Sequence, residues 1–425
     1  MPSFIRRGLE TLIRPFPAEE VTSIGPESDP RAAGLETADV DAIWHAAIGA
    51  YQTGLYPALA LCVRRKGVVV IDRAIGHASG NAPGDPPDAH KVRARHDGLY
   101  CMFSASKMVT AMLVHLLEER HQIHLDDPVA FYLPEFGRKG KHHITLRHVL
   151  THRAGIPRIP PALADPNLLG RPDQILALLC DQAPSWRAGR KLGYHALTGG
   201  FVLGAVIERV TGKTVREVLA DEILRPLKFA AFNFGVPTAR LKDVAHNAFT
   251  GPRVVPPLAT FIRRALSVDF DDAVRISNDP RYLTSIIPAG NICTTAGEAA
   301  RFMQLLLDGG TLDGVQVLDR RTIERATAEQ SYLEVDLTLG APVRYGMGFM
   351  LGAKLASVYG LDTPRAFGHL GFTNVFVWAD PDRDVAAALL TTGKPALAPA
   401  MARTWWLLST IARRIPKVAR PRKAA

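Results

Sequence analysis

The chain has 425 residues, of which 47% are hydrophobic and 22% are charged, values that exclude a disordered or fibrous protein and indicate a folded globular one. Its net charge of +10 is concentrated at one end, because residues 401–425 contain seven basic residues and no acid, and the other 400 residues carry only +3. This distribution excludes a generally basic surface of the nucleic-acid-binding kind.

The N-terminal segment, MPSFIRRGLETLIRPFP, has no continuous apolar stretch after its arginines, so it does not predict a secretory signal. No window is apolar enough to span a bilayer. The four cysteines lie far apart, without the spacing of a metal site or a disulfide framework. We therefore expect buried, reduced thiols and a cytoplasmic protein.

The first predicted elements are two strands, 58–64 and 68–71, joined by a tight turn at Arg65-Lys66-Gly67. A turn-rich stretch then leads to Ser104. The helix predicted after Ser104 is apolar on more than one face, which is typical of a helix buried on all sides.

From residue 125 to about 279 the pattern is mostly helical and is interrupted by prolines. The remaining predicted elements are a helix at 296–307, strands at 345–351, 375–379 and 385–391, and a closing helix from about 398. Strands at both ends of the chain predict an α/β (α+β) fold, with one mixed antiparallel sheet flanked by helices and a mostly helical lobe inserted in it. The expected divisions are an N-terminal extension (1–35), an α/β lobe (36–124 and 284–412), a helical lobe (125–283) and a basic tail (413–425).

Ser104 and Lys107 form a Ser-x-x-Lys motif at the start of the buried helix. Residues three apart share a helix face, so the lysine amine can reach the serine hydroxyl. A partly desolvated lysine has a lowered pKa and can activate a serine nucleophile. A helix-capping serine followed by a solvated lysine is the simpler interpretation of the motif alone, but the apolar surroundings disfavour it.

The run FSASK and the helix after it resemble the β-lactamase-like serine hydrolase superfamily, with the class C β-lactamase and penicillin-binding-protein fold, in which this serine is acylated. Further stretches resemble the family in the same order along the chain. They are 125–128, 144–157, 193–214 with Tyr194 of the Tyr-x-Asn motif, 287–310, and 367–393 with the third motif.

The chain departs from the family pattern at two positions. Ala196 occupies the asparagine position of the second motif, and His369-Leu370-Gly371 replaces Lys-Thr-Gly in the third. The first change removes the amide that grips an acylamino side chain, and the second removes the cation that binds a substrate carboxylate. Both changes resemble the carboxylesterases and the actinobacterial lipases of this superfamily.

The resemblance implies hydrolysis of short- to medium-chain carboxylic esters through an acyl-enzyme, with Ser104 as nucleophile and Lys107 and Tyr194 transferring protons. It also implies an oxyanion site formed by the backbone N–H groups of Ser104 and Phe372, beside Gly371. His369 is expected either to contact the substrate or to serve as a structural hydrogen-bond partner. We expect no cofactor, no metal and no nucleic-acid partner; the expected partner is a small ester.

Other interpretations remain open. A β-lactamase, a D-Ala-D-Ala-type peptidase or an acyltransferase would use the same residues, and a catalytically silent scaffold is a further alternative. His148 and His152 are spaced as metal ligands but lack the glutamate of His-Glu-x-x-His. The basic C-terminal segment, with Trp405 and Trp406, predicts either a helix packed on the sheet or peripheral contact with an anionic membrane, and the stretch 258–266 could join that contact or form a lid.

Overall fold

The computed structural model describes residues 11–253, 263, 268–396 and 401–418. Within these ranges the main sheet has ten strands, in the order β1-β3-β2-β18-β17-β16-β13-β12-β11, with β4 beside β3. Each neighbouring pair is antiparallel. The strands are β1 (Thr22–Ile24), β2 (Ala58–Arg65), β3 (Val68–Ser79), β4 (Val92–Arg93), β11 (Ser331–Asp336), β12 (Ala341–Tyr345), β13 (Met350–Leu351), β16 (Phe367–Gly371), β17 (Val375–Asp380) and β18 (Val385–Thr391).

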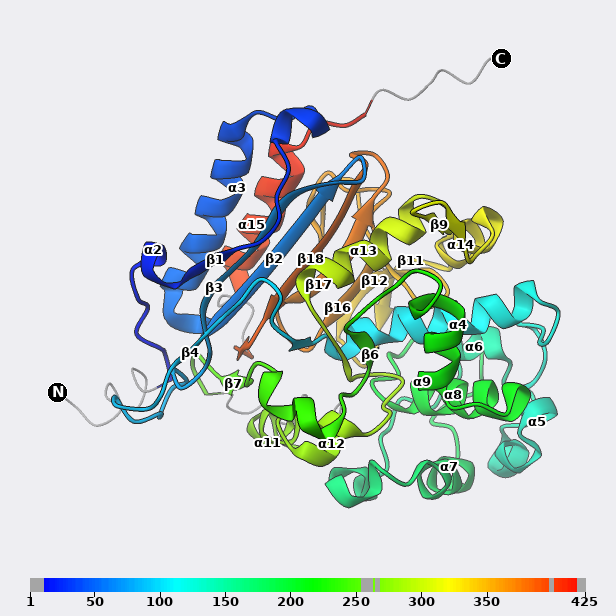
Figure 1. Ribbon diagram of the computed structural model, residues 1–425. Coiled ribbons are helices and arrows are strands. Elements are labelled where there is room, and N and C mark those ends of the chain that lie inside the picture. Colours follow the sequence, from blue (N-terminus) through cyan, green and yellow to red (C-terminus); the bar gives the residue numbers. More distant parts are fainter. Residues whose placement is uncertain (1–10, 254–262, 264–267, 397–400, 419–425) are drawn as a thin grey trace, which may run out of the picture.

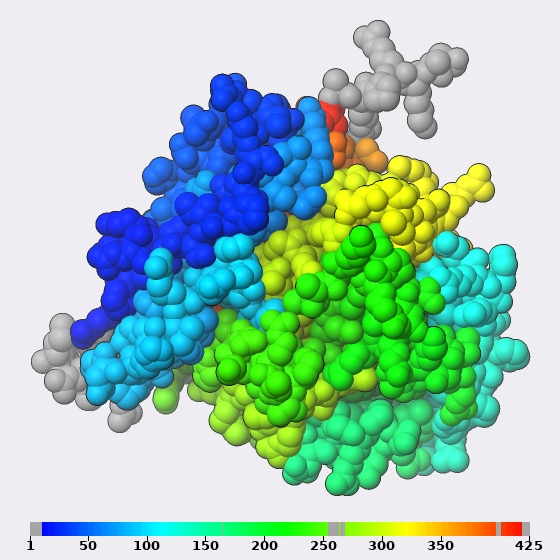
Figure 2. Space-filling model, in the orientation of Figure 1, coloured from blue at the N-terminus to red at the C-terminus, as the bar shows by residue number. Residues whose placement is uncertain are grey.

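Helices cover both faces of this sheet (Figure 1). On one face α3 (Thr37–Ala50) packs against α15 (Ala402–Arg414), and on the other α13 (Ala296–Leu307) lies over β2, β17 and β18. The helical lobe packs directly against the sheet lobe (Figure 2). Its helices are α5 (Val129–Tyr132), α6 (Leu146–Leu150), α7 (Pro172–Asp181), α8 (Thr198–Thr211), α9 (Val215–Leu219), α11 (Phe270–Ile276) and α12 (Pro280–Thr284). The predicted mixed fold is confirmed.

Two predicted elements take the expected form. Lys66 and Gly67 both have positive φ, 50° and 76°, which closes the tight turn between β2 and β3. The helix α4 (Ser106–Glu119) is buried at every position from Ser106 to Leu117, because it runs between the sheet and the helical lobe. A lysine in its first turn is therefore removed from water.

The strand predicted at 345–351 is wrong, because β12 ends at Tyr345 and β13 begins at Met350. The reason lies in the turn between them. Gly348 has φ of 92°, and a Cβ at this position would lie 2.1 Å from the Cβ of Ala111 on α4. The chain must turn here to let α4 approach, and only glycine allows it.

Two expected domain boundaries also need correction. Residues 22–24 do not belong to a separate extension, because β1 pairs with β3 at the edge of the sheet. Arg413 and Arg414 belong to α15 and not to a tail. The segment 258–266 falls outside the described residues except for Arg263, and residues 419–425 of the predicted tail also lie outside them.

Most of the aromatic and apolar face of α15 packs on the protein. Leu407, Leu408 and Ile411 are buried, and Trp405 Nε1 donates a hydrogen bond to Ser357 O at 3.0 Å. Trp406 is 47% exposed, with the Arg413 guanidinium over its ring. None of the described helices is both long and apolar enough to cross a bilayer. Peripheral membrane contact and the cytoplasmic location both stay predictions.

Candidate active site

Ser104 lies in a single 3₁₀ turn, Phe103–Ala105, that connects β5 (Tyr100–Cys101) to α4. Phe103 has φ of 49°, a left-handed conformation that costs a non-glycine residue about 1–3 kcal/mol and that is frequent at functional sites. Ser104 is not the N-cap of this turn or of α4, whose N-caps are Met102 and Ala105. The helix-cap interpretation of this serine therefore does not hold.

Lys107 is directed at Ser104. Its Nζ lies 3.0 Å from Ser104 Oγ and donates to Ala289 O at 2.9 Å. The side chain is 8% exposed, and burial lowers the pKa of the amine to about 7. A large fraction of Lys107 is therefore neutral near neutral pH, and its lone pair can accept the serine proton.

Tyr194, in the loop before α8, is the third residue of the site, beside Ser104 and Lys107. Its ring lies 4.9 Å from Lys107 Nζ, and its side chain lines the same cavity as Ser104, whose interaction with the phenol by itself lowers the pKa of Tyr194. Burial raises the pKa of Tyr194, and the charge of Asp336 raises it further. The phenol is therefore protonated at neutral pH, so in the resting site it is a proton donor and Lys107 is the base.

Asp336, at the end of β11, fixes the backbone beside Tyr194. It is completely buried, and its Oδ1 accepts from the backbone N–H groups of Tyr194, Thr338 and Leu339 at 3.0, 2.8 and 3.0 Å. Its Oδ2 accepts from the Tyr345 hydroxyl at 3.2 Å. No motif surrounds Asp336, so the sequence alone did not indicate its role.

We expect Asp336→Ala to leave four donors without their acceptor; two of them, the Tyr194 N–H and the Tyr345 hydroxyl, are buried, and each of these costs about 1–3 kcal/mol when unsatisfied. Asp336→Asn keeps one side-chain oxygen that can still accept from some of these donors, so this variant should lose less stability. Thermal melts should therefore rank wild type above Asn above Ala, and kcat should fall in the same order because Tyr194 loses its anchor. Equal kcat in all three proteins would contradict this role.

Buried imidazoles surround Tyr194 on its other sides. The His152 ring lies 4.8 Å from Tyr194, 5.4 Å from His195 and 5.0 Å from Tyr345, and the backbone N–H of His195 donates to its Nδ1 at 3.2 Å. Burial lowers the pKa of His195 to about 3 and that of His152 well below its usual value. These rings are neutral packing partners. Both lie inside the family-like stretches, which is the signal that could have identified them.

The third motif lies on β16, across from Ser104. A Cβ at position 371 would lie 2.3 Å from Met102 O, so only glycine lets this strand approach the nucleophile turn. The Phe372 ring packs 5.5 Å from that of Phe103. His369 lies 2.6 Å from Leu370 O through Nδ1, and burial lowers its pKa to about 3. It is therefore a neutral side chain, whose Nε2 has no hydrogen-bond partner among the described residues.

A cavity of about 280 Å³ opens over Ser104 and Tyr194. No charged side chain is found among the described residues that line it. Its apolar walls come from both lobes and are formed by Phe103, Ile159, Leu163, Ala196, Leu197, Val268, Ala273, Ile276, Leu339, Met350, Leu370 and Phe372. This volume is at the small end of the range for small-molecule pockets.

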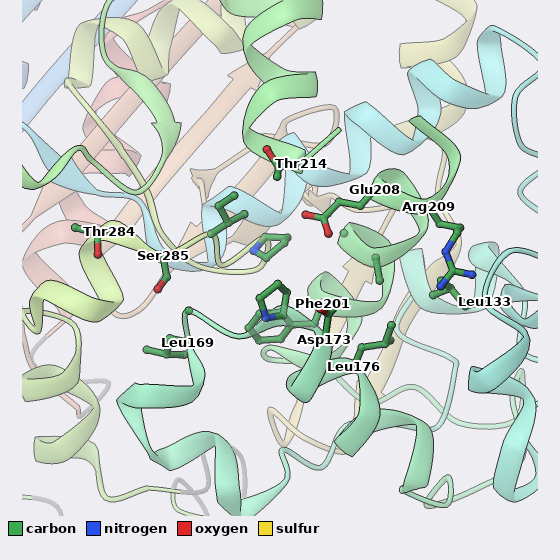
Figure 3. A pocket seen from close by; sticks show the side chains of 16 residues that line it. Leu133, Leu169, Asp173, Leu176, Phe201, Glu208, Arg209, Thr214, Thr284 and Ser285 are labelled. Carbon is green, nitrogen blue, oxygen red and sulfur yellow. The ribbon is translucent and has the colours of Figure 1, made fainter. Parts of the chain in front are cut away.

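A second cavity, of about 660 Å³, lies in the helical lobe, with Asp173, Phe201 and Glu208 among its walls (Figure 3). Ser104, Lys107 and Tyr194 are not part of its lining, so it is separate from the site around Ser104. Elsewhere, His148 Nδ1 accepts from the Thr145 backbone N–H in a helix cap. The described residues contain no cluster of three or more side chains suited to a metal ion.

A model of the beta-lactamase family matches residues 43–410. Over 308 residues the chain is 30% identical to the esterase/beta-lactamase LipL of Mycobacterium tuberculosis (strain ATCC 25618 / H37Rv), and the match covers 69% of each chain.

Solved structures match over both lobes. A penicillin-binding protein homologue from Caulobacter crescentus is 27% identical, with a TM-score of 0.74, and the match covers 90% of this chain and 99% of that one. A family VIII carboxylesterase has the same TM-score and coverage at 25% identity.

Proposed function

Because this chain belongs to the beta-lactamase family of serine hydrolases, we propose that it cleaves neutral carboxylic esters with short to medium acyl chains, through an acyl-enzyme on Ser104. The observation that carries the proposal is that no charged side chain is found among the described residues that line the cavity over Ser104. The cavity walls are uncharged, and His369, at the position of the family's lysine, is neutral.

Lack of charge disfavours the substrates of β-lactamases and D-Ala-D-Ala-type peptidases, which carry a carboxylate. An anion buried in this cavity would lose its hydration without gaining a cation from the cavity walls, which costs several kcal/mol. Ala196 also offers no amide to bind an acylamino group. A neutral ester with an apolar acyl chain avoids both costs.

The proposed reaction begins when Ser104 Oγ attacks the ester carbonyl and its proton passes to neutral Lys107. The N–H groups of Ser104 and Phe372 stabilise the oxyanion. The Tyr194 phenol donates its proton to the leaving alkoxide and recovers one from the Lys107 ammonium. Water then attacks the acyl-enzyme through the same residues, releasing the acid and regenerating Ser104.

The direct test compares p-nitrophenyl esters, from acetate to palmitate, with nitrocefin, a chromogenic β-lactam. We expect ester hydrolysis with an optimum at short or medium chains and kcat/KM for nitrocefin lower by at least about 100-fold, the discrimination expected from an unpaired buried charge. Comparable rates on both substrates would favour the β-lactamase interpretation. Transfer of the acyl group to an added alcohol in preference to water would favour an acyltransferase.

The acyl-binding walls lead to a prediction about chain length. Ala196→Leu adds three carbons to the cavity, so the optimum should move to shorter acyl chains, with longer esters losing roughly 10-fold or more in kcat/KM. Ala205→Leu is a matched control, because Ala205 lies on α8 and lines only the second cavity. A parallel shift in the two variants would show that the acyl chain binds elsewhere.

The pKa of Lys107 leads to a prediction about pH. Only the neutral amine accepts the serine proton, so kcat/KM should rise about 10-fold per unit below pH 7 and become constant above it. Burial also lowers the pKa of Lys394 to about 7. Lys394→Met, which changes a residue outside the site, should therefore keep the profile. A rate that is independent of pH from about 5.5 to 8.5 would contradict the role of Lys107.

A further inference from the structure

The fold brings two cysteines together beneath the nucleophile turn. Cys101 on β5 is paired directly with Cys293 on β8 (Ile292–Thr294), in a small sheet completed by β6 (Phe232–Phe234). The Met102 backbone N–H donates to Ile292 O at 2.8 Å, which makes the cysteines a non-hydrogen-bonded pair of the antiparallel ladder. In such pairs the Cα atoms lie about 4.5 Å apart with side chains on one face, within the 4.4–6.8 Å range of disulfides.

The surroundings of the two thiols differ. Burial by itself raises the pKa of Cys101, but hydrogen bonds from Cys293 and from the Phe103 backbone N–H, together with the nearby Lys394 amine, lower it overall. The interaction with Cys101 raises the pKa of Cys293, and burial adds to this increase. The Cys101 thiol, which donates to Gly290 O at 3.5 Å, thus has a lower pKa than the Cys293 thiol beside it, an order typical of an attacking and a resolving cysteine.

The other two cysteines lack these features. Burial raises the pKa of both Cys62 and Cys180. Cys62 stands opposite Asp72 on one side and Ala388 on the other. Cys62 and Cys180 are therefore internal controls within the same chain.

We propose that Cys101 and Cys293 form a redox-active pair that a small hydroperoxide converts into a disulfide. The Cys101 thiolate attacks one peroxide oxygen, breaking the O–O bond and forming a sulfenic acid. Cys293 then displaces the hydroxyl as water. In total two thiols and one hydrogen peroxide give one disulfide and two waters. The thiols are 3% and 2% exposed, so the oxidant must be small.

Oxidation should also slow the reaction at Ser104. This part of the inference rests on the proposed function. Disulfides most often hold their Cα atoms about 5.5–6 Å apart, farther than in a non-hydrogen-bonded pair, so closing the bond shifts β5 relative to β8. β5 leads directly to Ser104, and Ala289, just before β8, accepts the Lys107 hydrogen bond. A displacement of about 1 Å at a catalytic group costs up to 100-fold in rate, so we expect a reversible loss of ester hydrolysis of about tenfold or more.

The experiment treats folded protein with hydrogen peroxide, alkylates the remaining thiols in denaturant and measures mass. We expect a loss of about 2 Da before alkylation, two alkylated thiols at Cys62 and Cys180, and a cross-linked peptide joining Cys101 to Cys293. Cys293→Ser should trap the sulfenic acid instead, as a dimedone adduct on Cys101. Peptide mapping of the wild type decides the question even if this variant fails to fold.

Four alkylated thiols after treatment, or oxidation of Cys62 and Cys180 at the same rate, would overturn the proposal. If the disulfide form hydrolyses esters as fast as the thiol form, and dithiothreitol leaves the rate unchanged, the regulatory part of the proposal is overturned. If the reduced protein hydrolyses no ester, the proposed function fails, while the mass measurement still decides the thiol pair.

Discussion

Ser104→Ala should lower kcat/KM for ester hydrolysis by about 10⁴-fold or more, because it removes the atom that forms the acyl-enzyme in the proposed reaction. The structure supplies the reason in three contacts. Ser104 Oγ lies 3.0 Å from Lys107 Nζ, and the Ser104 side chain interacts with Tyr194 and lines the cavity with the uncharged walls. A fluorophosphonate probe should label wild type at Ser104 and leave the variant unlabelled.

Ser106→Ala is the matched control for this substitution. Ser106 is buried two residues further along, and its Oγ accepts from the Ile292 backbone N–H at 3.0 Å. Losing that acceptor costs about 1–3 kcal/mol of stability, but the acylation step should stay within tenfold of wild type. If the two variants lose activity equally, with equal losses in melting temperature, the effect comes from the fold and Ser104 is not the nucleophile.

Lys107→Ala should lower kcat by about 10³-fold, the contribution of a well-placed general base. Lys107→Arg tests whether Lys107 acts as a base or only as a fixed positive charge. A guanidinium stays protonated at any working pH, so it can attract an oxyanion but cannot accept the serine proton. We expect the arginine variant to be as inactive as the alanine variant in a pH-rate series with p-nitrophenyl esters.

Lys394→Met provides the comparison with a second buried lysine. Lys394 Nζ donates to Thr391 O at 2.6 Å and lies over the Phe103 ring, away from Ser104 Oγ. This variant can lose stability but should keep most of its kcat. Substantial activity in Lys107→Arg would mean that the lysine acts through its charge, and the proposed proton path would have to be replaced.

The sequence predicted the elements whose patterns are local. The run of apolar residues after Ser104 fixed the buried helix α4, and the helix at 296–307 and the strand at 385–391 were predicted with the bounds that α13 and β18 have. Ser104, Lys107 and Tyr194 were also predictable, since each lies in a recognisable motif. The structure brings them together, which spacing along the chain alone could not establish.

What the sequence missed depends on contacts between distant segments. The break between β12 and β13 follows from the approach of α4 to Gly348, which no local pattern records. Asp336 lies in no motif, and it accepts a hydrogen bond from the backbone of Tyr194, 142 residues away in the chain. Cys101 and Cys293 likewise look unrelated until β5 and β8 pair. In each case tertiary packing, and not local preference, decides the outcome.

The order of strands in the main sheet has a consequence for how the protein is made. β2 pairs with β18, and the Ala58 N–H donates to the side chain of Thr392, 334 residues away. During synthesis the segment with the nucleophile leaves the ribosome long before the strand that completes its sheet, so the inner edge of β2 remains open to other chains. Closing so long a loop is entropically slow. We therefore expect the nascent chain to need protection against aggregation until its last hundred residues have been translated.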